Sequence, residues 1–568
     1  MRRMFDLGLI AAVAIAVAPA SAEPIAPVLA AYQTVLDEER DDLPGRWPDL
    51  SPAAVKARND RLTAVARRLD APAPANEGGE DRITRDILGW RLHARLEEAR
   101  FDTERMPFIG GDGFYTTPIY VASTTVLHDE AEAKAWIAKI GALPAYYDQA
   151  IVNMKRGLAT GFVQPKIVVD ATLAQLRTAA GQAVADNALL KPFAKRPPAV
   201  DASRWEALKA EATQAVASRV KPAEARAVAF MADDYLPHAR AGLGAGSMPG
   251  GQDYYAHLVR VSTTTDMTPQ QVFDLGQSEV ARIGAEMEAA KHAAGFDGSM
   301  HDFLVMLRSD KRFYATDVDD YVARVSAVVK RVDEYLPRYF GTLPRLTFTI
   351  KLKPPELDGT SGGYFLGDPA KGVAGAVMLS KSSATDPLFS MPSWILHEGV
   401  PGHHLQIALA QERTDLPPFR RKDDVTAFVE GWALYTERLG DEMGMYRTPY
   451  EQVGRLSYEM WRACRLVMDV GIHAKGWSFD QAAACLREHT ALPERVVTGE
   501  TLRYVGWPAQ ALAYKVGEVR IRAMRARAEV ALGPKFDIRA FHDALLDDGP
   551  MPMAILDRQI DGWIAARR

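Results

Sequence analysis

Along most of the chain, apolar residues recur between polar ones at the spacing that is typical of amphipathic α-helices. Two helix starts carry a capping box. Thr268 and Gln271 form the first, with Pro269 at the first helical position, and the helical pattern then continues to Gly295. Ser478 and Gln481 form the second. Near the end, an Ala- and Arg-rich stretch from Pro508 to Leu532 predicts another long helix.

Strand signals are few. The β-branched, alternating run from Leu346 to Leu352 and the apolar run from Gly375 to Leu379 each predict a short strand. Loops are predicted where Gly, Pro and polar residues gather, at 71–81, 195–201, 244–253 and 353–372. We therefore expect a mainly α fold, with a small sheet just before residue 397. A weakly signalled division near residue 340 separates an N-terminal helical region, 23–340, from a region at 341–568 that carries the candidate chemistry.

The first 22 residues have the layout of a secretory signal peptide. Arg2 and Arg3 are followed by an apolar run from Leu7 to Ala18 and by a small-residue cleavage site that ends at Ala22. About 12 apolar residues are too few to span a bilayer core of ~30 Å. We therefore expect an exported protein, periplasmic or extracellular, that has no membrane span after cleavage.

Composition narrows the class of partner. The 568 residues are 48% hydrophobic and 25% charged, with a net charge of -5, as in ordinary soluble proteins. Without a basic stripe, this mild acidity argues against nucleic acid as a partner. Two cysteines, Cys464 and Cys485, are present. They would form one disulfide in an oxidising compartment or remain two buried thiols, and the sequence leaves both alternatives open.

Three histidines and one glutamate lie close together in the segment from Trp394 to Gln406, which contains HEGVPGHHLQ. A His-Glu pair on an apolar helix, followed by a second His, is the arrangement in which two imidazoles hold Zn²⁺ and the Glu activates a water molecule. The second His normally lies at i+4, one turn after the first. Here that position is Pro401, so the plain motif fails.

The interruption itself predicts a local structure. Pro401 has no N–H to continue the helix, and Gly402 tolerates unusual dihedral angles, so the backbone is expected to bulge here. A bulge is needed whichever histidine binds, because His404, at i+7, would otherwise lie about 10 Å along the helix axis from His397. His403 is the preferred second ligand, because Leu405 and Leu409 then continue the apolar face. His404 is the alternative.

The segment Asp424–Glu437 supplies a third ligand for the ion. Glu430 stands among Phe428, Val429 and Trp432, where an uncompensated carboxylate would be costly. Gly431 beside it would let another backbone approach closely. Glu437, at i+7, either supports the metal ligands from behind or is a solvated helix charge; both readings remain open.

At these residues the chain resembles the DUF885 family of bacterial proteins, whose signature is similar to HExxPGHHLQ followed by FxEGWALY; here the segments read HEGVPGHHLQ and FVEGWALY. Weaker similarities lie at 250–264 and in the C-terminal segments DVGIHAKGWS and RYVGWPAQALAYKVGE. The family looks related to the helical gluzincin (HExxH-type) zinc metallopeptidases. This resemblance implies a large helical zincin-like fold, with a substrate cleft, a small sheet beside the active-site helix and a water-activating Glu.

These observations predict a zinc metallopeptidase that hydrolyses small peptides, as an oligopeptidase, dipeptidase or carboxypeptidase. One Zn²⁺ would be held by His397, His403 and Glu430, with Glu398 as the general base. The candidate donors to the oxyanion are His473, Tyr504 and Tyr514. The segment Gly359–Leu366, including Gly362, Gly363 and Tyr364, is expected to hold the substrate backbone.

Arg465 has two interpretations. The simpler is a helix ion pair with Asp469, and the other is a contact with a peptide carboxylate. Two rival functions also remain: a zinc amidase acting on cell-wall peptides, and an exported protein that binds a metal or a peptide without catalysis. The sequence leaves open the cleavage specificity, the oligomeric state and the biological substrate.

Overall fold

The computed structural model describes residues 23–353, 362–369, 372–422 and 425–568. The predicted signal peptide, 1–22, lies outside the described residues, as do positions 359–361 of the predicted substrate-binding segment. Within the described residues, no helix is both long and apolar enough to cross a lipid bilayer.

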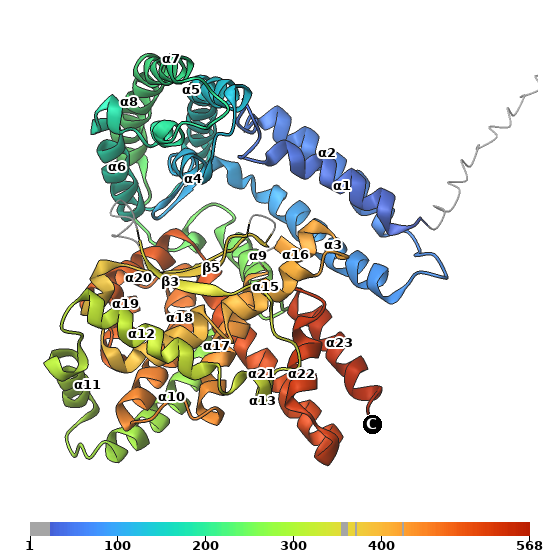
Figure 1. The fold of residues 1–568 in the computed structure, drawn as a ribbon, viewed down its shortest axis with the longest axis vertical. Helices are drawn as coiled ribbons and strands as arrows, with labels where there is room; N and C mark the ends of the chain where they lie inside the picture. The colour runs from blue at the N-terminus through green and yellow to red at the C-terminus, as the bar shows by residue number, and fades with distance from the viewer. Residues whose placement is uncertain (1–22, 354–361, 370–371, 423–424) are drawn as a thin grey trace, which may run out of the picture.

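Helices dominate the structure, which confirms the mainly α fold class (Figure 1). Helices α4–α8 form one lobe, drawn at the top of the view, and α1–α3 run beside it. The bounds here are α1 (Ile25–Glu39), α2 (Pro52–Leu69), α3 (Gly79–Glu98), β1 (Phe108–Ile109), β2 (Asp112–Gly113), α4 (Thr117–Thr124), α5 (Glu130–Thr160), α6 (Lys166–Gly181), α7 (Ala202–Ala215) and α8 (Lys221–Ala229).

The remaining helices form a larger body, with the sheet at the side nearest the lobe (Figure 1). Its elements are α9 (Gly251–Thr263), α10 (Pro269–Ala293), α11 (Met300–Ser309), α12 (Val318–Val332), α13 (Leu336–Tyr339), β3 (Phe348–Leu352), β4 (Gly363–Phe365), β5 (Gly375–Leu379), α14 (Met391–Glu398), α15 (His403–Glu412), α16 (Pro418–Lys422), α17 (Thr426–Glu442), α18 (Pro449–His473), α19 (Phe479–His489), α20 (Glu494–Gly506), α21 (Ala513–Leu532), α22 (Ile538–Leu546) and α23 (Met553–Ala565).

Of the three helix starts that the sequence predicted, two are confirmed and one is wrong. Both predicted capping boxes are present, at Thr268 for α10 and at Ser478 for α19. The helix predicted from Pro508 was wrong at its start: Ala509 has φ +68°, a short 3₁₀ turn follows at Gln510–Leu512, and α21 begins only at Ala513. A left-handed residue cannot continue an α-helix, so the backbone at Ala509 delays the start.

The small sheet has the strand order β3-β5-β4. β3 and β5 match the two predicted strands and pair in parallel, whereas β4 lies within a predicted loop and pairs antiparallel to β5. Because β4 is bonded to a neighbour on one side, it forms an edge of the three-stranded sheet. Strand β5 is mostly buried, and it leads into α14 through two 3₁₀ turns. The sheet therefore lies directly before the His-Glu helix, as predicted.

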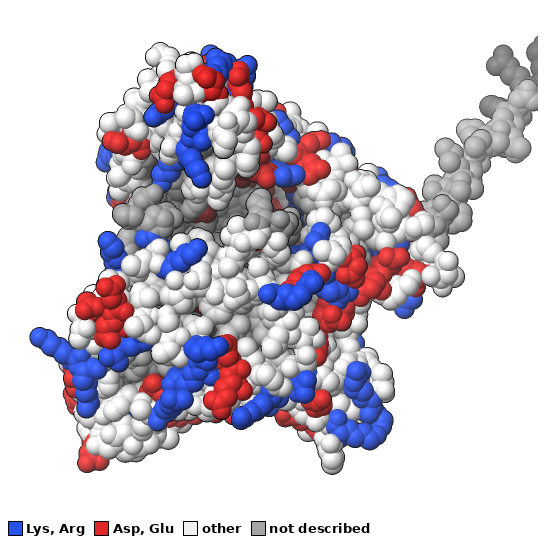
Figure 2. Space-filling model, viewed as in Figure 1, with Lys and Arg blue, Asp and Glu red and all other residues white. Residues whose placement is uncertain are grey.

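Two large hydrophobic cores hold the molecule together. One joins α5–α8 to α10 and α18–α20, and the other joins α1–α3 to α12, α14, α17 and α21–α23. Each core contains residues from both sides of position 340, and the predicted division there stays a prediction. On the face that Figure 2 shows, positive and negative side chains are interspersed over both the lobe and the body.

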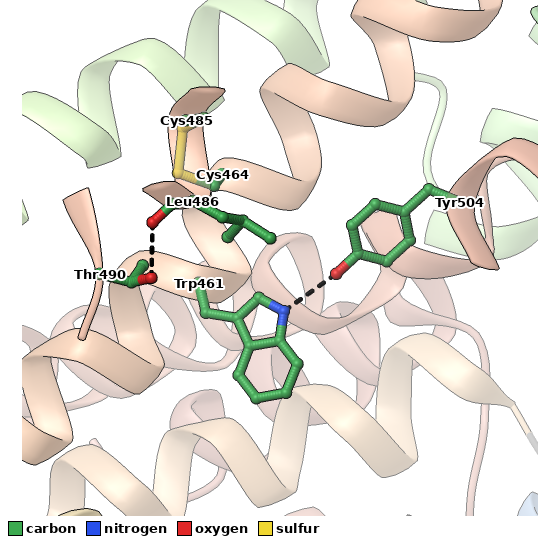
Figure 3. Close-up of a disulfide and its surroundings, with 6 residues drawn as sticks. All are labelled: Trp461, Cys464, Cys485, Leu486, Thr490 and Tyr504. Atoms are coloured by element: carbon green, nitrogen blue, oxygen red, sulfur yellow. Dashed lines mark hydrogen bonds between the residues drawn. A yellow bond between two sulfur atoms is a disulfide. The ribbon is translucent and has the colours of Figure 1, made fainter. Parts of the chain in front are cut away.

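Cys464 on α18 and Cys485 on α19 form a disulfide, which settles the alternative that the sequence left open. Figure 3 shows it beside Trp461, whose indole N–H donates to the Tyr504 hydroxyl at 3.0 Å. Thr490, just beyond α19, donates to the carbonyl of Leu486 at 2.6 Å. The disulfide therefore ties α19 to the helix that also carries Arg462 and Arg465.

His542 on α22 makes the stability pH-dependent. Its Nδ1 lies 2.8 Å from the carbonyl of Tyr339 and its Nε2 lies 2.7 Å from the Tyr435 hydroxyl. A neutral ring satisfies both contacts, by donating from Nδ1 and accepting at Nε2. Burial lowers the pKa of His542 to about 3, whereas an unfolded histidine titrates at about 6.5. As the pH falls below 6.5, His542 therefore binds a proton in the unfolded chain but not in the folded chain.

Between pH 7 and pH 5, we expect the free energy of unfolding of wild type to fall by about 2 kcal/mol more than that of His542→Phe. The slope follows from ~1.4 kcal/mol per pH unit for one proton. The variant is less stable at pH 7, because the Tyr339 carbonyl and the Tyr435 hydroxyl lose their partner. Urea unfolding of both proteins at several pH values measures the difference. A difference that is constant with pH would contradict the assignment of a neutral His542.

Candidate metal centre

The helix that carries His397 breaks where the sequence predicted a bulge. α14 ends at Glu398, the Val400–Pro401 peptide bond is cis, and α15 begins at His403. The N–H of His404 donates to the carbonyl of Gly399 at 3.1 Å, one residue further back than in a regular α-helix. At Gly402 a Cβ would lie 1.9 Å from the His397 carbonyl oxygen. The close approach requires glycine at this position.

Helix α17 satisfies backbone carbonyls that the break leaves without helical partners. The indole N–H of Trp432 donates to the Pro401 carbonyl at 2.9 Å, and the Thr436 hydroxyl donates to the Leu396 carbonyl at 3.0 Å. Both side chains are buried. A buried carbonyl without a partner would cost free energy, so these two residues stabilise the bulge. The sequence analysis missed this role, although their i, i+4 spacing puts both on one helix face.

The bulge brings His403 back against His397. Their rings are 4.7 Å apart, centroid to centroid, and nearly perpendicular. Glu430 of α17 completes the group: its Oε2 lies 3.3 Å from Nε2 of His397 and 3.4 Å from Nε2 of His403. These three residues offer ligand atoms that all lie within 4.8 Å of one another. The candidate metal site of the structure is therefore the predicted set His397, His403 and Glu430.

His404, the alternative ligand, lies on another side of the helix. Its Nε2 is 3.0 Å from the Leu346 carbonyl, and its Nδ1 is 3.0 Å from the Tyr364 hydroxyl. Burial lowers the pKa of His404 to about 4, so the ring is neutral. The structure does not bring His404 into the group with His397. Instead, the residue ties α15 to the β3 and β4 side of the cleft.

Glu437 supports His397 from behind. The carboxylate is 1% exposed, which removes the solvated alternative. It lies 2.8 Å from Nδ1 of His397 and accepts a hydrogen bond of 2.7 Å from Ser393, while Arg462 lies 3.5 Å away. Burial acts to raise the pKa of Glu437, but Arg462 and His397 outweigh it and lower the pKa. An ionised Glu437 holds the Nδ1 proton of His397, so that Nε2 presents a lone pair.

This hydrogen-bond pattern tests whether the residues fit a cation. With its proton on Nδ1, His397 directs a lone pair at the Glu430 carboxylate, so two acceptors face each other at 3.3 Å. Within the described residues, Glu430 Oε2 is buried without a hydrogen-bond partner, and so is Nδ1 of His403. A cation between the three atoms would remove the repulsion. A neutral imidazole pair with a carboxylate is a ligand set of catalytic zinc sites, so the residues fit the ion.

Without a metal ion, protons would have to supply the positive charge. Burial disfavours a charged His397, but hydrogen bonds to Glu430 and Glu437 outweigh it and raise its pKa to about 9. Burial also acts to raise the pKa of Glu430, but His403 and His397 reverse this and hold it well below its usual value. Both shifts have the same cause: these side chains favour a positive charge among them, which either a proton or a metal ion can supply.

Glu398 and the predicted substrate segment meet in one cleft of about 780 Å³. The N–H of Tyr364 on β4 donates to Oε2 of Glu398 at 2.8 Å. Gly362 and Gly363 line the same cleft, together with His397, His403 and Glu430. The Glu398 carboxylate therefore faces the cleft beside the candidate metal site.

Helices α17 and α21 touch at two glycines beside the third ligand. A Cβ on Gly431 would lie 2.6 Å from the Cα of Gly517, so only glycines allow this approach, as the sequence predicted for Gly431. The crossing brings Tyr514 of α21 to the cleft beside Glu430. Burial, together with the Glu430 carboxylate, raises the pKa of Tyr514, which keeps its hydroxyl protonated as a donor.

The two other predicted donors do not line the cleft. His473 is buried, accepting at Nδ1 from the Ala245 N–H at 2.9 Å, with its Nε2 2.8 Å from the Tyr504 carbonyl. The Tyr504 hydroxyl accepts from Arg465 and donates to Glu500 at 2.5 Å. Both side chains hold the segments around the cleft together, because their polar atoms form hydrogen bonds to other residues of the protein.

Arg465 does not form the predicted ion pair with Asp469. It pairs with Glu500 at 3.1 Å, and Asp469 accepts from the Tyr255 hydroxyl and the Ala509 N–H instead. That contact fixes the left-handed turn before α21. The guanidinium of Arg465 lies 4.2 Å from the Tyr514 ring centroid and lines the cleft.

A second cluster of carboxylates, Glu279, Glu459 and Glu518, has a different explanation. The ammonium of Lys515 lies 2.8, 2.8 and 2.9 Å from these three side chains and takes the position that a metal ion would need. Burial acts to lower the pKa of Lys515, but the carboxylates outweigh it and raise the pKa. The group is a buried ion-pair network that joins α10, α18 and α21.

Lys515→Met is expected to lower the free energy of unfolding by about 3–5 kcal/mol, because three buried carboxylates lose a cation that contacts all of them. The matched control is Lys330→Met, whose exposed ammonium lies 2.8 Å from Asp333 and should contribute little to stability. Denaturant unfolding of both variants measures the two losses. Equal losses would contradict the account of the network.

Comparisons with known proteins agree with this fold. A model of the DUF885 family, described as a bacterial protein of unknown function, matches residues 27–560. The crystal structure of "the putative lipoprotein from Colwellia psychrerythraea" superposes with a TM-score of 0.89 at 25% identity, covering 95% of this chain and 99% of that one. A "putative lipoprotein of unknown function from Shewanella oneidensis" has a TM-score of 0.70 at 18% identity, covering 94% and 96%, and shows the fold alone. No curated protein matches the chain.

Proposed function

The chain belongs to the DUF885 family, and we propose that it is an exported zinc-dependent peptidase, related to the helical gluzincins, that hydrolyses small peptides. The observation that carries the proposal is the convergence of His397, His403 and the partnerless Glu430 oxygen on one point, beside a cleft into which Glu398 also faces. Three protein ligands leave one position of a tetrahedral ion open, which favours a catalytic over a structural site.

Glu398 acts as the general base. Its carboxylate takes a proton from the attacking water and delivers it to the leaving amine. A zinc ion held by His397, His403 and Glu430 would supply Lewis acidity to the scissile carbonyl and to the attacking water. The N–H of Tyr364, 2.8 Å from Glu398, keeps that carboxylate pointed into the cleft. Tyr514 is the remaining candidate of the three predicted oxyanion donors, because it lines the cleft beside Glu430.

Strand β4 is the element that would hold the substrate backbone. It is a sheet edge, its partner β5 covers the opposite side, and Gly362 to Tyr364 line the cleft. An extended peptide can add to such an edge by backbone hydrogen bonds, with its carbonyl groups directed toward the metal ligands. The two glycines keep this edge free of bulky side chains.

Export is supported by three features. The first 22 residues have the signal-peptide pattern, Cys464 and Cys485 form a disulfide, and each of the two similar structures is titled a "putative lipoprotein". Disulfides persist in oxidising compartments such as the bacterial periplasm. We therefore propose that the protein works in the periplasm or outside the cell.

A metal-removal experiment tests the proposal. The mature chain, residues 23–568, is loaded with one equivalent of zinc and incubated with a peptide library and, separately, with muropeptides. We expect cleavage of the peptides, a loss of at least ~10²-fold after treatment with 1,10-phenanthroline, and recovery when zinc is returned. Cleavage of muropeptides alone would favour an amidase. If the zinc-loaded protein cleaves neither, the proposed function is wrong.

A further inference from the structure

One wall of the cleft carries an excess of positive charge. Arg462 and Arg465 on α18 and Arg495 and Arg503 on α20 all line it, against two carboxylates on the same wall, Asp386 and Glu500. A divalent ion would balance the negative charges of Glu398 and Glu430 on the opposite side. The arginine wall would then remain net positive and favour an anionic substrate.

The four arginines differ in how far their donors are used. Arg503 is fully engaged: it pairs with Glu500 at 3.0 Å and donates to Gln510 at 2.6 Å. Arg495 forms an ion pair with Asp386 at the more exposed part of the wall. Arg462 lies behind the metal ligands, 3.5 Å from Glu437. Two donors are left over among the described residues, Nε of Arg462 and Nη1 of Arg465, and of these Nη1 is a terminal nitrogen of its guanidinium.

Arg465 is 4% exposed, and its position is fixed on several sides. Its Nε donates to the Tyr504 hydroxyl at 2.8 Å and its Nη2 donates to Glu500 at 3.1 Å, while Trp461 and Tyr514 lie against the guanidinium. Its Nη1 has no hydrogen-bond partner among the described residues. A buried guanidinium N–H without an acceptor is costly, so a ligand that brings an acceptor would gain free energy there.

Tyr514 joins this arginine to the metal site. Its ring lies 4.2 Å from the Arg465 guanidinium, and Tyr514 lines the cleft together with Glu430. The path from Arg465 past one tyrosine side chain to the metal ligands spans on the order of 10 Å, about three residues of extended peptide at ~3.3 Å each. A group bound at Arg465 would therefore lie within about three residues of the bond at the metal.

Resting on the proposed peptidase function, we propose that Arg465 binds a carboxylate of the peptide substrate through Nη1, within about three residues of the cleaved bond. A guanidinium held in one orientation suits a carboxylate, because the charge-assisted hydrogen bond is strong and directional. The carboxylate is either the C-terminus, which makes the enzyme a carboxypeptidase that releases one to three residues, or an acidic side chain.

Binding measurements test this without depending on turnover. Zinc-loaded Glu398→Gln protein is titrated with three probes: N-acetyl-Ala-Ala-Ala with a free carboxylate, the same peptide as its amide, and N-acetyl-Ala-Ala-Glu amide. At least one carboxylate-bearing probe should bind about 10–100-fold more tightly than the Ala amide, as expected for a hydrogen bond to a charged group. The probe that does so identifies the source of the carboxylate.

The variants locate the contact. Arg465→Gln should remove the preference while leaving the affinity for the Ala amide within about threefold, since a merely structural role would weaken all three probes alike. Arg465→Lys keeps the charge between Trp461 and Tyr514 but withdraws Nη1, so the preference should fall there too. Arg495→Gln, which removes the same charge from the same wall, is the control and should keep the preference.

Three results would overturn the inference: equal affinities for all three probes, no measurable binding of any probe, or a preference that survives in the Arg465 variants. None of these results contradicts the proposed function, which is tested separately by zinc-dependent cleavage of the peptide library. Conversely, if the protein prefers carboxylate probes but cleaves no peptide, Arg465 would still be a carboxylate-binding site and the peptidase function would be wrong.

Discussion

Replacing Glu398 by Gln is expected to reduce peptide hydrolysis by about 10²–10⁴-fold while zinc remains bound. Gln has almost the same shape, and its amide oxygen can still accept the Tyr364 N–H that lies 2.8 Å from the carboxylate. It cannot take a proton from water. Because Glu398 is not among the three clustered ligands, the metal site should be unaffected. Initial rates on a cleaved library peptide, together with zinc stoichiometry, measure both effects.

Glu437→Gln is the matched control. It makes the same substitution at a different glutamate of the same candidate metal centre, and its expected result is different. Glu437 lies 2.8 Å from His397 Nδ1 and fixes the proton there, so its loss should weaken zinc binding by about 10–100-fold. At saturating zinc, its rate should largely recover, whereas that of Glu398→Gln should not. Hydrolysis by Glu398→Gln at the parent rate would show that Glu398 is not the base.

Replacing His403 by Ala is expected to weaken zinc binding by more than about 100-fold, and replacing His404 by Ala by much less. A direct ligand contributes more than the outer partners, whose removal alone costs about 10–100-fold. His404 donates to the Leu346 carbonyl, so its loss should appear mainly as a stability decrease of ~0.5–1.5 kcal/mol. Competition with a chelator of known affinity measures zinc binding, and thermal unfolding measures stability.

The two neighbouring histidines control for each other, because the substitution and the position on α15 are almost the same. Equal retention of zinc by His403→Ala and wild type would remove His403 from the ligand set. A loss in His404→Ala as large as in His403→Ala would mean that the break between α14 and α15 is more plastic than its contacts with Trp432 and Thr436 suggest.

The sequence predicted the helical fold class and the bulge, because both follow from local rules. Pro401 has no N–H to donate, and a Cβ at position 402 would lie only 1.9 Å from the His397 carbonyl oxygen, so glycine is required there. These two residues are therefore enough to predict the interruption of the helix. The choice of His403 over His404 also followed from the apolar face that Leu405 continues. Capping boxes at Thr268 and Ser478 placed two helix starts for the same local reason.

Residues whose partners come from distant segments could not be predicted in this way. His473 and Tyr504 have donor chemistry, but their polar atoms bond to each other's segments and to Ala245, and this depends on how the turn at Ala245–Ser247 packs against α18 and α20. The same is true of Arg465, whose i+4 neighbour Asp469 instead fixes the turn at Ala509. Lys515 was missed, because two of its three carboxylate partners, Glu279 and Glu459, come from other helices, and Glu518 at i+3 alone indicates only an ordinary helix ion pair.

The central claim is that one ion binds between His397, His403 and Glu430, and anomalous scattering at the zinc edge from crystals of the zinc-loaded protein tests it most directly. If the ion binds there, the anomalous map has one strong peak at about 2.0–2.1 Å from Nε2 of both histidines and about 2.0–2.2 Å from a Glu430 oxygen. A peak on His404, a peak elsewhere, or no peak between these three side chains would contradict it.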